Sequence, residues 1–138
     1  MAFWLLKTEP STYSFADLVR ERRTRWDGVT NPQALANLRA MKAGDEALVY
    51  HSGAKEAVGL ARVVAESTPD PRDPTGKLVA VDLAAERALP APVGLEALKA
   101  EAAFRGSPLL RQGRLSVVPL TAEQWRAVLR LSKAPTRP

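Results

Sequence analysis

Two places in this 138-residue chain hold side chains that could do chemistry. His51 and Ser52 are adjacent, and Asp27 could orient the imidazole as a general base. Neighbouring residues of a strand point to opposite faces of a sheet, so His51 and Ser52 are poorly placed to pair. The chain has no Gly-x-Ser-x-Gly elbow and no glycine-rich phosphate loop. An enzyme that processes RNA or a nucleotide through His51 and Asp27 is therefore the weaker hypothesis.

A binding site is better supplied with suitable side chains. The candidates are three stacking groups, three hydrogen-bonding groups and three cations: Trp26, Tyr50 and His51; Asn31, Ser52 and Gln112; Lys7, Arg111 and Arg114. A nucleobase held out of its helix is recognised by stacking, by hydrogen bonds to its edge and by contacts to its phosphates. Taken singly, each aromatic residue is at least as typical of a core position.

Composition narrows the possible chemistry. The chain has no cysteine and a single histidine, which excludes disulfides, thiolate nucleophiles, zinc sites with Cys ligands and His-rich metal sites. The net charge of +5 favours a polyanionic partner such as nucleic acid, although an Arg-rich composition explains the charge equally well. No apolar run is long enough for a membrane span, and the N-terminus does not resemble a signal peptide. We expect a cytoplasmic protein without a metal or another cofactor.

The elements around Trp26 are the easiest to predict. Residues 3–8 read as a strand, and Ser14 with Asp17 forms a capping box for a helix over 15–22. The arginines at 20, 22, 23 and 25 then lie at the end of that helix, where cations suit its dipole. Residues 26–31 form a loop around Gly28, and Asn31 caps a second helix that begins at Pro32 and is terminated by Gly44.

The rest of the chain alternates between short strands and helices. We expect a hairpin from strands 46–52 and 57–66, a loop over 67–76, a strand over 77–88, and a break at Pro90 and Pro92. A helix near 94–103, a polar loop over 108–114 and a strand over 115–119 follow. Thr121 and Gln124 then cap a final helix. These elements predict one α+β domain over 1–131, with a mainly antiparallel sheet curving toward a small barrel, and a disordered tail over 132–138.

Several motifs in order carry a family resemblance. They are Phe3-Trp4-Leu5-Leu6-Lys7-Thr8-Glu9-Pro10, Ser14-Phe15-Ala16-Asp17-Leu18, Trp26-Asp27-Gly28-Val29-Thr30-Asn31, Asn37-Leu38-Arg39, Tyr50-His51-Ser52 and the stretch from Leu110 to Val117. Together they resemble the EVE domain family over about residues 3 to 130. The resemblance implies a PUA-like fold, a β-barrel surrounded by short helices, related to YTH and ASCH domains. It also implies a non-catalytic reader of a modified base in DNA or RNA.

The resemblance assigns roles to individual residues. Trp26 would wall the pocket, with Asn31 and the backbone of Val29 lining it, and Lys7 and Thr8 at its floor or mouth. The opposite side would come from Tyr50, His51 and Ser52, and the closing side from Gln112. The phosphate-binding residues would be Arg39, Arg111 and Arg114. A further hypothesis is a domain that uses the same cleft for a small molecule or a protein instead of nucleic acid.

Overall fold

The computed structural model describes residues 1–133. The strands are β1 (Phe3–Thr8), β2 (Arg23–Trp26), β3 (Glu46–His51), β4 (Glu56–Pro69), β5 (Val79–Gly94) and β6 (Val117–Leu120). The helices are α1 (Phe15–Glu21), α2 (Pro32–Ala40), α3 (Leu95–Lys99), α4 (Pro108–Arg111) and α5 (Ala122–Lys133), with a 3-10 turn at Ala102–Phe104. The predicted tail begins too early, because α5 runs on to Lys133 and buries Ser132. Residues 134–138 of that predicted tail lie outside the described residues.

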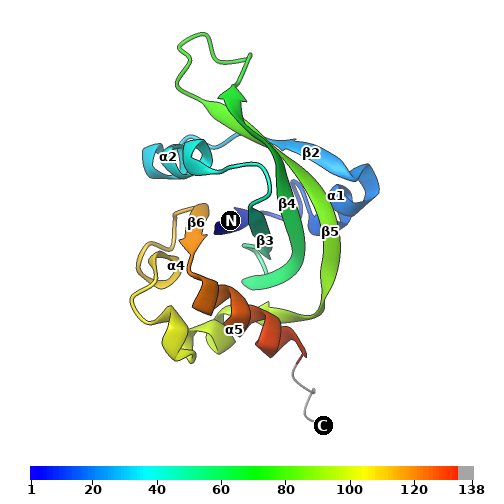
Figure 1. Ribbon diagram of the computed structural model, residues 1–138, viewed down its shortest axis with the longest axis vertical. Coiled ribbons are helices and arrows are strands. Elements are labelled where there is room, and N and C mark those ends of the chain that lie inside the picture. The colour runs from blue at the N-terminus through cyan, green and yellow to red at the C-terminus, as the bar shows by residue number, and fades with distance from the viewer. Residues whose placement is uncertain (134–138) are drawn as a thin grey trace.

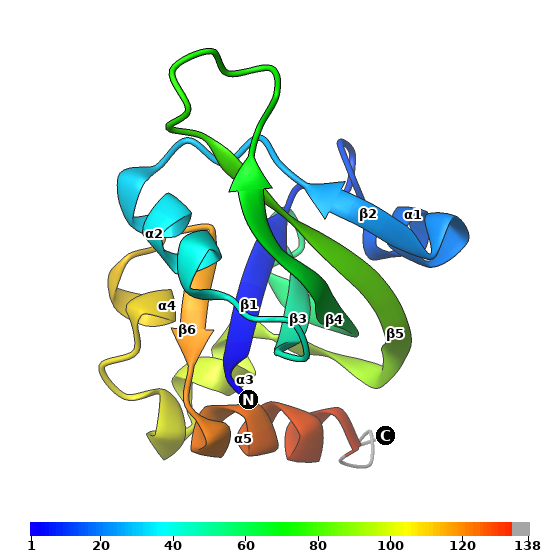
Figure 2. The ribbon, with the colours of Figure 1, turned by 45° about the horizontal axis from the view of Figure 1, so that its top comes forward.

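The strands form one curved six-stranded sheet in the order β2-β5-β4-β3-β1-β6. Only β1 and β3 pair in parallel, and all other neighbours are antiparallel. The prediction of a mixed α+β fold with a mainly antiparallel sheet is confirmed. The sheet is not a closed barrel, because β2 and β6 are its two free ends. Figures 1 and 2 show the curvature, and they show the β4–β5 hairpin running out beyond the other strands.

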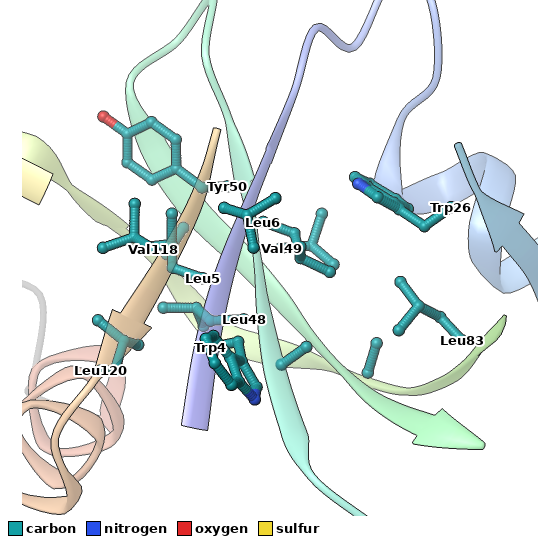
Figure 3. Packing of buried hydrophobic residues seen from close by; sticks show 14 of the residues in the cluster. Trp4, Leu5, Leu6, Trp26, Leu48, Val49, Tyr50, Leu83, Val118 and Leu120 are labelled. Atoms are coloured by element: carbon teal, nitrogen blue, oxygen red, sulfur yellow. The ribbon is translucent and has the colours of Figure 1, made fainter. Parts of the chain in front are cut away.

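The core fills both faces of the central strands. Leu5, Leu6 and Leu48 have no exposed surface, and α5 adds the ring of Trp125, which stacks on Phe3 with centroids 4.8 Å apart. Figure 3 shows this packing around β1, with Trp4 and Trp26 in separate parts of the cluster. Because β3 is covered on both faces, its side-chain alternation does not reveal which face leads to a ligand.

Local capping is as the sequence predicts. Ser14 Oγ accepts the Asp17 N–H at 3.1 Å, and Asp17 Oδ2 accepts the Ser14 N–H at 2.8 Å, which completes the capping box of α1. Asn31 Oδ1 accepts the Ala34 N–H at 3.0 Å at the start of α2. Helix α2 ends at Ala40 with Met41 as its C-cap, before the predicted terminator Gly44, which takes a φ of +96° in the turn that follows. The cap at Asn31 fixes where the chain leaves the Trp26 loop.

Long-range pairing changes two predicted segments. Residues 23–26 form the strand β2 on β5, so Arg23 and Arg25 do not sit at the end of a helix. Pro90 and Pro92 do not break the chain, because β5 continues to Gly94. Its pairing with β4 jumps from Ala88 to Val93, so both prolines lie in a bulge where no N–H is needed for the ladder.

The last third of the chain also departs from the predicted pattern. The expected helix over 94–103 is two pieces, α3 and a 3-10 turn. The expected polar loop over 108–114 begins with the short helix α4, which Ser107 caps by accepting the Leu109 N–H at 3.1 Å. The final strand covers 117–120.

Candidate nucleic-acid interface

A hollow of about 530 Å³ lies where β1 ends and β2 leads into α2. Three segments line it: the end of β1 with the turn after it, the end of β2 with the loop before α2, and the approach to β6. The lining residues are Lys7, Thr8, Glu9, Thr12, Tyr13, Thr24, Arg25, Trp26, Asp27, Gly28, Val29, Thr30, Asn31, Arg114 and Ser116. Three stretches that are distant in sequence thus converge on one concave surface.

Trp26 and Tyr13 are the aromatic members of this lining. Their rings meet edge to face, with centroids 6.1 Å apart and planes at 83°. Trp26 is only 8% exposed, so it is a core residue that also reaches the hollow. Its indole N–H has no hydrogen-bond partner within residues 1–133. Every fully buried side-chain nitrogen or oxygen in that part of the chain has a partner, so the indole nitrogen is not fully buried and borders open space.

Tyr13 is held by two contacts. Its hydroxyl donates to Glu21 Oε1 at 2.7 Å, and its carbonyl accepts the hydroxyl of Thr8 at 2.7 Å. Burial, together with the neighbouring Glu21 carboxylate, raises the pKa of the Tyr13 hydroxyl. The two contacts hold the Tyr13 ring against Trp26.

The loop over residues 27–30 forms one wall of the hollow. Gly28 has a φ of +78°, a conformation that favours glycine, and Val29 is buried. No backbone hydrogen bond to these four residues is present in the described part of the chain. Asp27 Oδ2 accepts from Arg72 Nη2 at 2.6 Å, which ties the loop to the β4–β5 hairpin. The backbone polar groups of this wall are therefore free to bond water or a ligand.

Cations and hydrogen-bonding groups surround the aromatic pair. Lys7 Nζ donates to the Gly113 carbonyl at 2.9 Å, and burial lowers the pKa of Lys7. Arg114 is exposed and has no ion-pair partner among residues 1–133. Asn31 accepts the α2 cap bond with its side-chain oxygen, and its amide N–H₂ group has no hydrogen-bond partner among residues 1–133, so it can donate to a ligand.

Three predicted site residues on and after β3 lie outside the lining. Tyr50 is 3% exposed, and Figure 3 shows it on the other side of β1 from Trp26. The Lys7 ammonium, which lines the hollow, lies 5.8 Å from the Tyr50 ring centroid. His51 Nε2 accepts the Phe15 N–H at 3.0 Å, and Ser52 Oγ donates to the Thr8 carbonyl at 3.3 Å. His51 and Ser52 thus bond the backbone of α1 and of β1 and do not line the hollow.

The remaining predicted residues are spread over the surface near the hollow. Arg111 and Gln112 are exposed at the end of α4 and do not line it. Arg39 lies on α2, where its Nη2 donates to the Lys77 carbonyl at 2.6 Å. The structure thus brings together six of the predicted residues: Lys7, Thr8, Trp26, Val29, Asn31 and Arg114.

Sequence reasoning overlooked Tyr13, Thr24, Arg25 and Ser116 as lining residues. The alternation of Thr24 with Trp26 on one strand face was the available clue, but it needed β2 to be recognised as a strand. Tyr13 precedes the capping box of α1, and nothing local indicates that it reaches Trp26. Among residues 1–133, no cluster of His, Asp or Glu side chains is placed to hold a metal ion.

The model of the EVE domain family matches residues 2–131. The chain belongs to the EVE domain family. Thymocyte nuclear protein 1 of Rattus norvegicus is 34% identical over an alignment of 167 residues, which covers 96% of this chain and 74% of that protein.

Solved structures agree with this EVE domain assignment. A Rhodopseudomonas palustris protein is 42% identical, with a TM-score of 0.90 over 96% of this chain and 93% of that chain. Human THYN1 in complex with 5-methylcytosine-containing DNA is 33% identical, with a TM-score of 0.86 over 99% of this chain and 100% of that chain. A YTH domain of Zygosaccharomyces rouxii, solved with N6-methyladenosine RNA, is 14% identical with a TM-score of 0.61, and it shares the fold.

The location of the protein is less defined than its fold. Within residues 1–133, no helix has the length and apolar character needed to cross a bilayer. The cytoplasmic location expected from the sequence stays a prediction.

Proposed function

We propose that this protein is a non-catalytic reader of a modified base in DNA or RNA, and that the base enters the hollow beside Trp26. The observation that carries the proposal is the human THYN1 complex with 5-methylcytosine-containing DNA, because that chain shares the whole fold at 33% identity. The YTH likeness supports the fold of such a reader and nothing finer.

The chemistry of the hollow suits a base. Trp26 and Tyr13 offer aromatic surface, and stacking of one base on an aromatic ring contributes about 1–3 kcal/mol. The Asn31 amide and the free N–H groups of residues 27–30 can donate to the acceptors on a base edge. Lys7 and Arg114 lie beside them, where the phosphates that flank the base would need positive charge.

The enzymatic hypothesis has less support. His51 Nε2 accepts a backbone N–H, so that nitrogen carries no proton and points at α1. Asp27 faces Arg72, and it lines the hollow while His51 does not. An acid–base pair needs the two groups within reach of one substrate.

The test compares oligonucleotides that differ only in one base modification. Binding of labelled DNA and RNA carrying 5-methylcytosine, N6-methyladenine or the unmodified base is measured by fluorescence anisotropy. Wild-type protein should prefer one modified oligonucleotide. Trp26→Leu removes the aromatic face while filling most of its volume, and it should remove that preference.

A matched control separates binding from folding. Trp125 is 7% exposed, as buried as Trp26, but it lies on α5 outside the hollow. Trp125→Leu should therefore cost similar stability and keep the preference. Equal wild-type affinity for every modified and unmodified oligonucleotide would overturn the proposal. Tight binding of a free small molecule, with little dependence on salt, would support the small-molecule hypothesis instead.

A further inference from the structure

The β4–β5 arm, defined here as residues 70–78, connects the two longest strands. Figures 1 and 2 show it projecting past α2 and β2, on the side where the loop before α2 crosses. Exposed loops are more mobile than the elements they connect, so a loop that holds one conformation requires specific contacts.

Two aspartates give the arm a fixed shape. Asp73 accepts the Thr75 N–H at 3.0 Å, the Thr75 hydroxyl at 2.7 Å and the Leu78 N–H at 2.8 Å. Asp70 is 5% exposed and accepts the Arg72 N–H at 2.9 Å. Both carboxylates are thus used inside the turn, and the two basic residues of the arm, Arg72 and Lys77, are exposed.

The arm is fastened to the hollow on one side and to α2 on the other. Arg72 Nη2 lies 2.6 Å from Asp27, a residue of the hollow, and Arg25 Nη2 donates to the Pro69 carbonyl at 3.2 Å. Across the arm, Arg39 Nη2 donates to the Lys77 carbonyl at 2.6 Å. The guanidinium of Arg72 therefore sits at the rim of the hollow.

Arg72 is held in place by hydrogen bonds, but part of its guanidinium has no partner. Its Nε and Nη2 donate to the two oxygens of Asp70, both at 3.2 Å, which holds the guanidinium plane in place. Its side chain is still 69% exposed, and its Nη1 has no partner within residues 1–133. The ammonium of Lys77, on the same arm, also has no partner there.

We propose that the β4–β5 arm is a docking surface for the nucleic-acid backbone, with Arg72 and Lys77 contacting phosphates next to the base that the hollow holds. This inference rests on the proposed function, since it places the strand that carries the base. Arg72 lies between the carboxylates of Asp27 and Asp70, and its exposed Nη1 edge is the part of the guanidinium that a phosphate can reach. Phosphate contacts position the nucleic acid and do not read its sequence or modification.

The experiment measures affinity against salt for the modified oligonucleotide and for its unmodified partner. Arg72→Ala and Lys77→Ala should each weaken both affinities by the same factor and leave their ratio unchanged. Each should also lower the slope of log K against log salt by about 0.9 on duplex DNA. Between about 50 and about 200 mM salt, each variant should therefore lose about threefold less affinity than the wild type.

Two controls distinguish phosphate contact from general charge and from a purely structural role. Arg126→Ala removes the same charge from an exposed position on α5 and should leave the salt slope unchanged. Arg72→Lys keeps a cation at this position but loses the paired hydrogen bonds to Asp70, so it should keep the wild-type salt slope. If Arg72→Lys reproduces Arg72→Ala, then Arg72 only fastens the loop and the inference is wrong.

The outcomes for the two proposals differ. If both arm variants keep the wild-type slope of log K against log salt and keep the preference for a modified base, the docking surface is wrong and the proposed reader function is unaffected. A shallower slope without any preference for a modification overturns the reader and supports the docking surface. A wild-type protein that binds no nucleic acid overturns both.

Discussion

Trp4 and Trp26 are almost equally buried, at 7% and 8% exposed, yet they sit in opposite chemical surroundings. Trp4 donates its indole N–H to Asp45 Oδ2 at 3.0 Å, and the same carboxylate accepts the N–H groups of Ala2 and Lys42. Trp26 has an indole N–H without a partner in residues 1–133 and a polar hollow beside it. Figure 3 shows the two rings in separate regions of the core.

The difference teaches that burial does not separate a tryptophan enclosed in the core from one that also lines a hollow. The Trp4 end is closed, because Asp45 accepts hydrogen bonds from the Trp4 indole and from the N–H groups of Ala2 and Lys42. The Trp26 end is left open, because its loop has no backbone hydrogen bonds and its indole donor is free. Hydrogen-bond satisfaction is the property that distinguishes them.

The largest effect on stability is expected at the closed end. Asp45→Ala leaves the buried indole of Trp4 and two N–H groups without their acceptor, which should cost about 3 kcal/mol of unfolding free energy. Urea denaturation followed by circular dichroism measures this loss. The folded variant should keep its preference for a modified oligonucleotide, and a lost preference would show that the two ends are coupled.

Replacing each tryptophan by phenylalanine compares the ends directly. The volume change is the same, but Trp4→Phe also removes a donor from the buried Asp45 carboxylate. We expect Trp4→Phe to cost about 1–3 kcal/mol more than Trp26→Phe. Equal destabilisation in urea titrations would mean that the hydrogen bond at Trp4 contributes nothing and that the comparison fails.

Asp45 and its neighbour Glu46 should respond to pH in opposite directions. Burial alone would raise the pKa of Asp45, but its hydrogen bonds from Ala2, Lys42 and Trp4 prevail and lower the pKa. Its contribution is therefore present above the unfolded pKa of about 3.9 and is lost as the pH falls through the lower folded pKa. Stability measured from about pH 5 down to about pH 2 should fall less steeply in Asp45→Asn.

The contribution of Glu46 to stability changes with pH in the opposite direction. Burial, followed by its hydrogen bond with Glu86, raises the pKa of Glu46 to about 7. The stabilisation is complete below the unfolded pKa of about 4.3 and is lost as the pH rises through the folded pKa. Glu46→Gln should flatten the stability profile between these two values. An unchanged profile in chemical denaturation across that range would contradict the prediction.

The smallest effect on stability is expected at the open end. Asn31→Ala removes the cap of α2 and should cost about 1 kcal/mol, whereas Asn31→Ser keeps a capping oxygen and should be nearly neutral. Both lack the amide N–H₂ group, so both should weaken binding of the modified oligonucleotide. Normal binding by Asn31→Ser would remove Asn31 from the set of ligand donors.

Local chemistry was predictable from sequence and long-range pairing was not. The capping box of α1 and the cap of α2 were predicted because each depends on residues three apart. Strand β2 was missed because Arg23 and Arg25 give no apolar alternation, and only pairing with β5 makes the segment a strand. The prolines of β5 were misjudged because the bulge that tolerates them is set by the register of β4.

The candidate site divides in the same way. The loop at Trp26 and the cap at Asn31 are contiguous in sequence, and the prediction placed both in the site. Tyr50 was assigned to the site as a stacking group and from the family resemblance. Because β3 is buried on both faces, its side-chain alternation could not show that Tyr50 faces away from Trp26. Tyr13 was missed because only the fold brings it 6.1 Å from Trp26.

An unclosed sheet carries a risk of joining edge to edge with another copy, and both edges here are protected. Asn37 Nδ2 donates to the Val117 carbonyl at 2.8 Å, so α2 occupies a bonding position on β6. Pro119, on the same strand, has no N–H to offer. The other edge, β2, has four residues, two of them arginines. The sheet can therefore stay open for a ligand without becoming a template for aggregation.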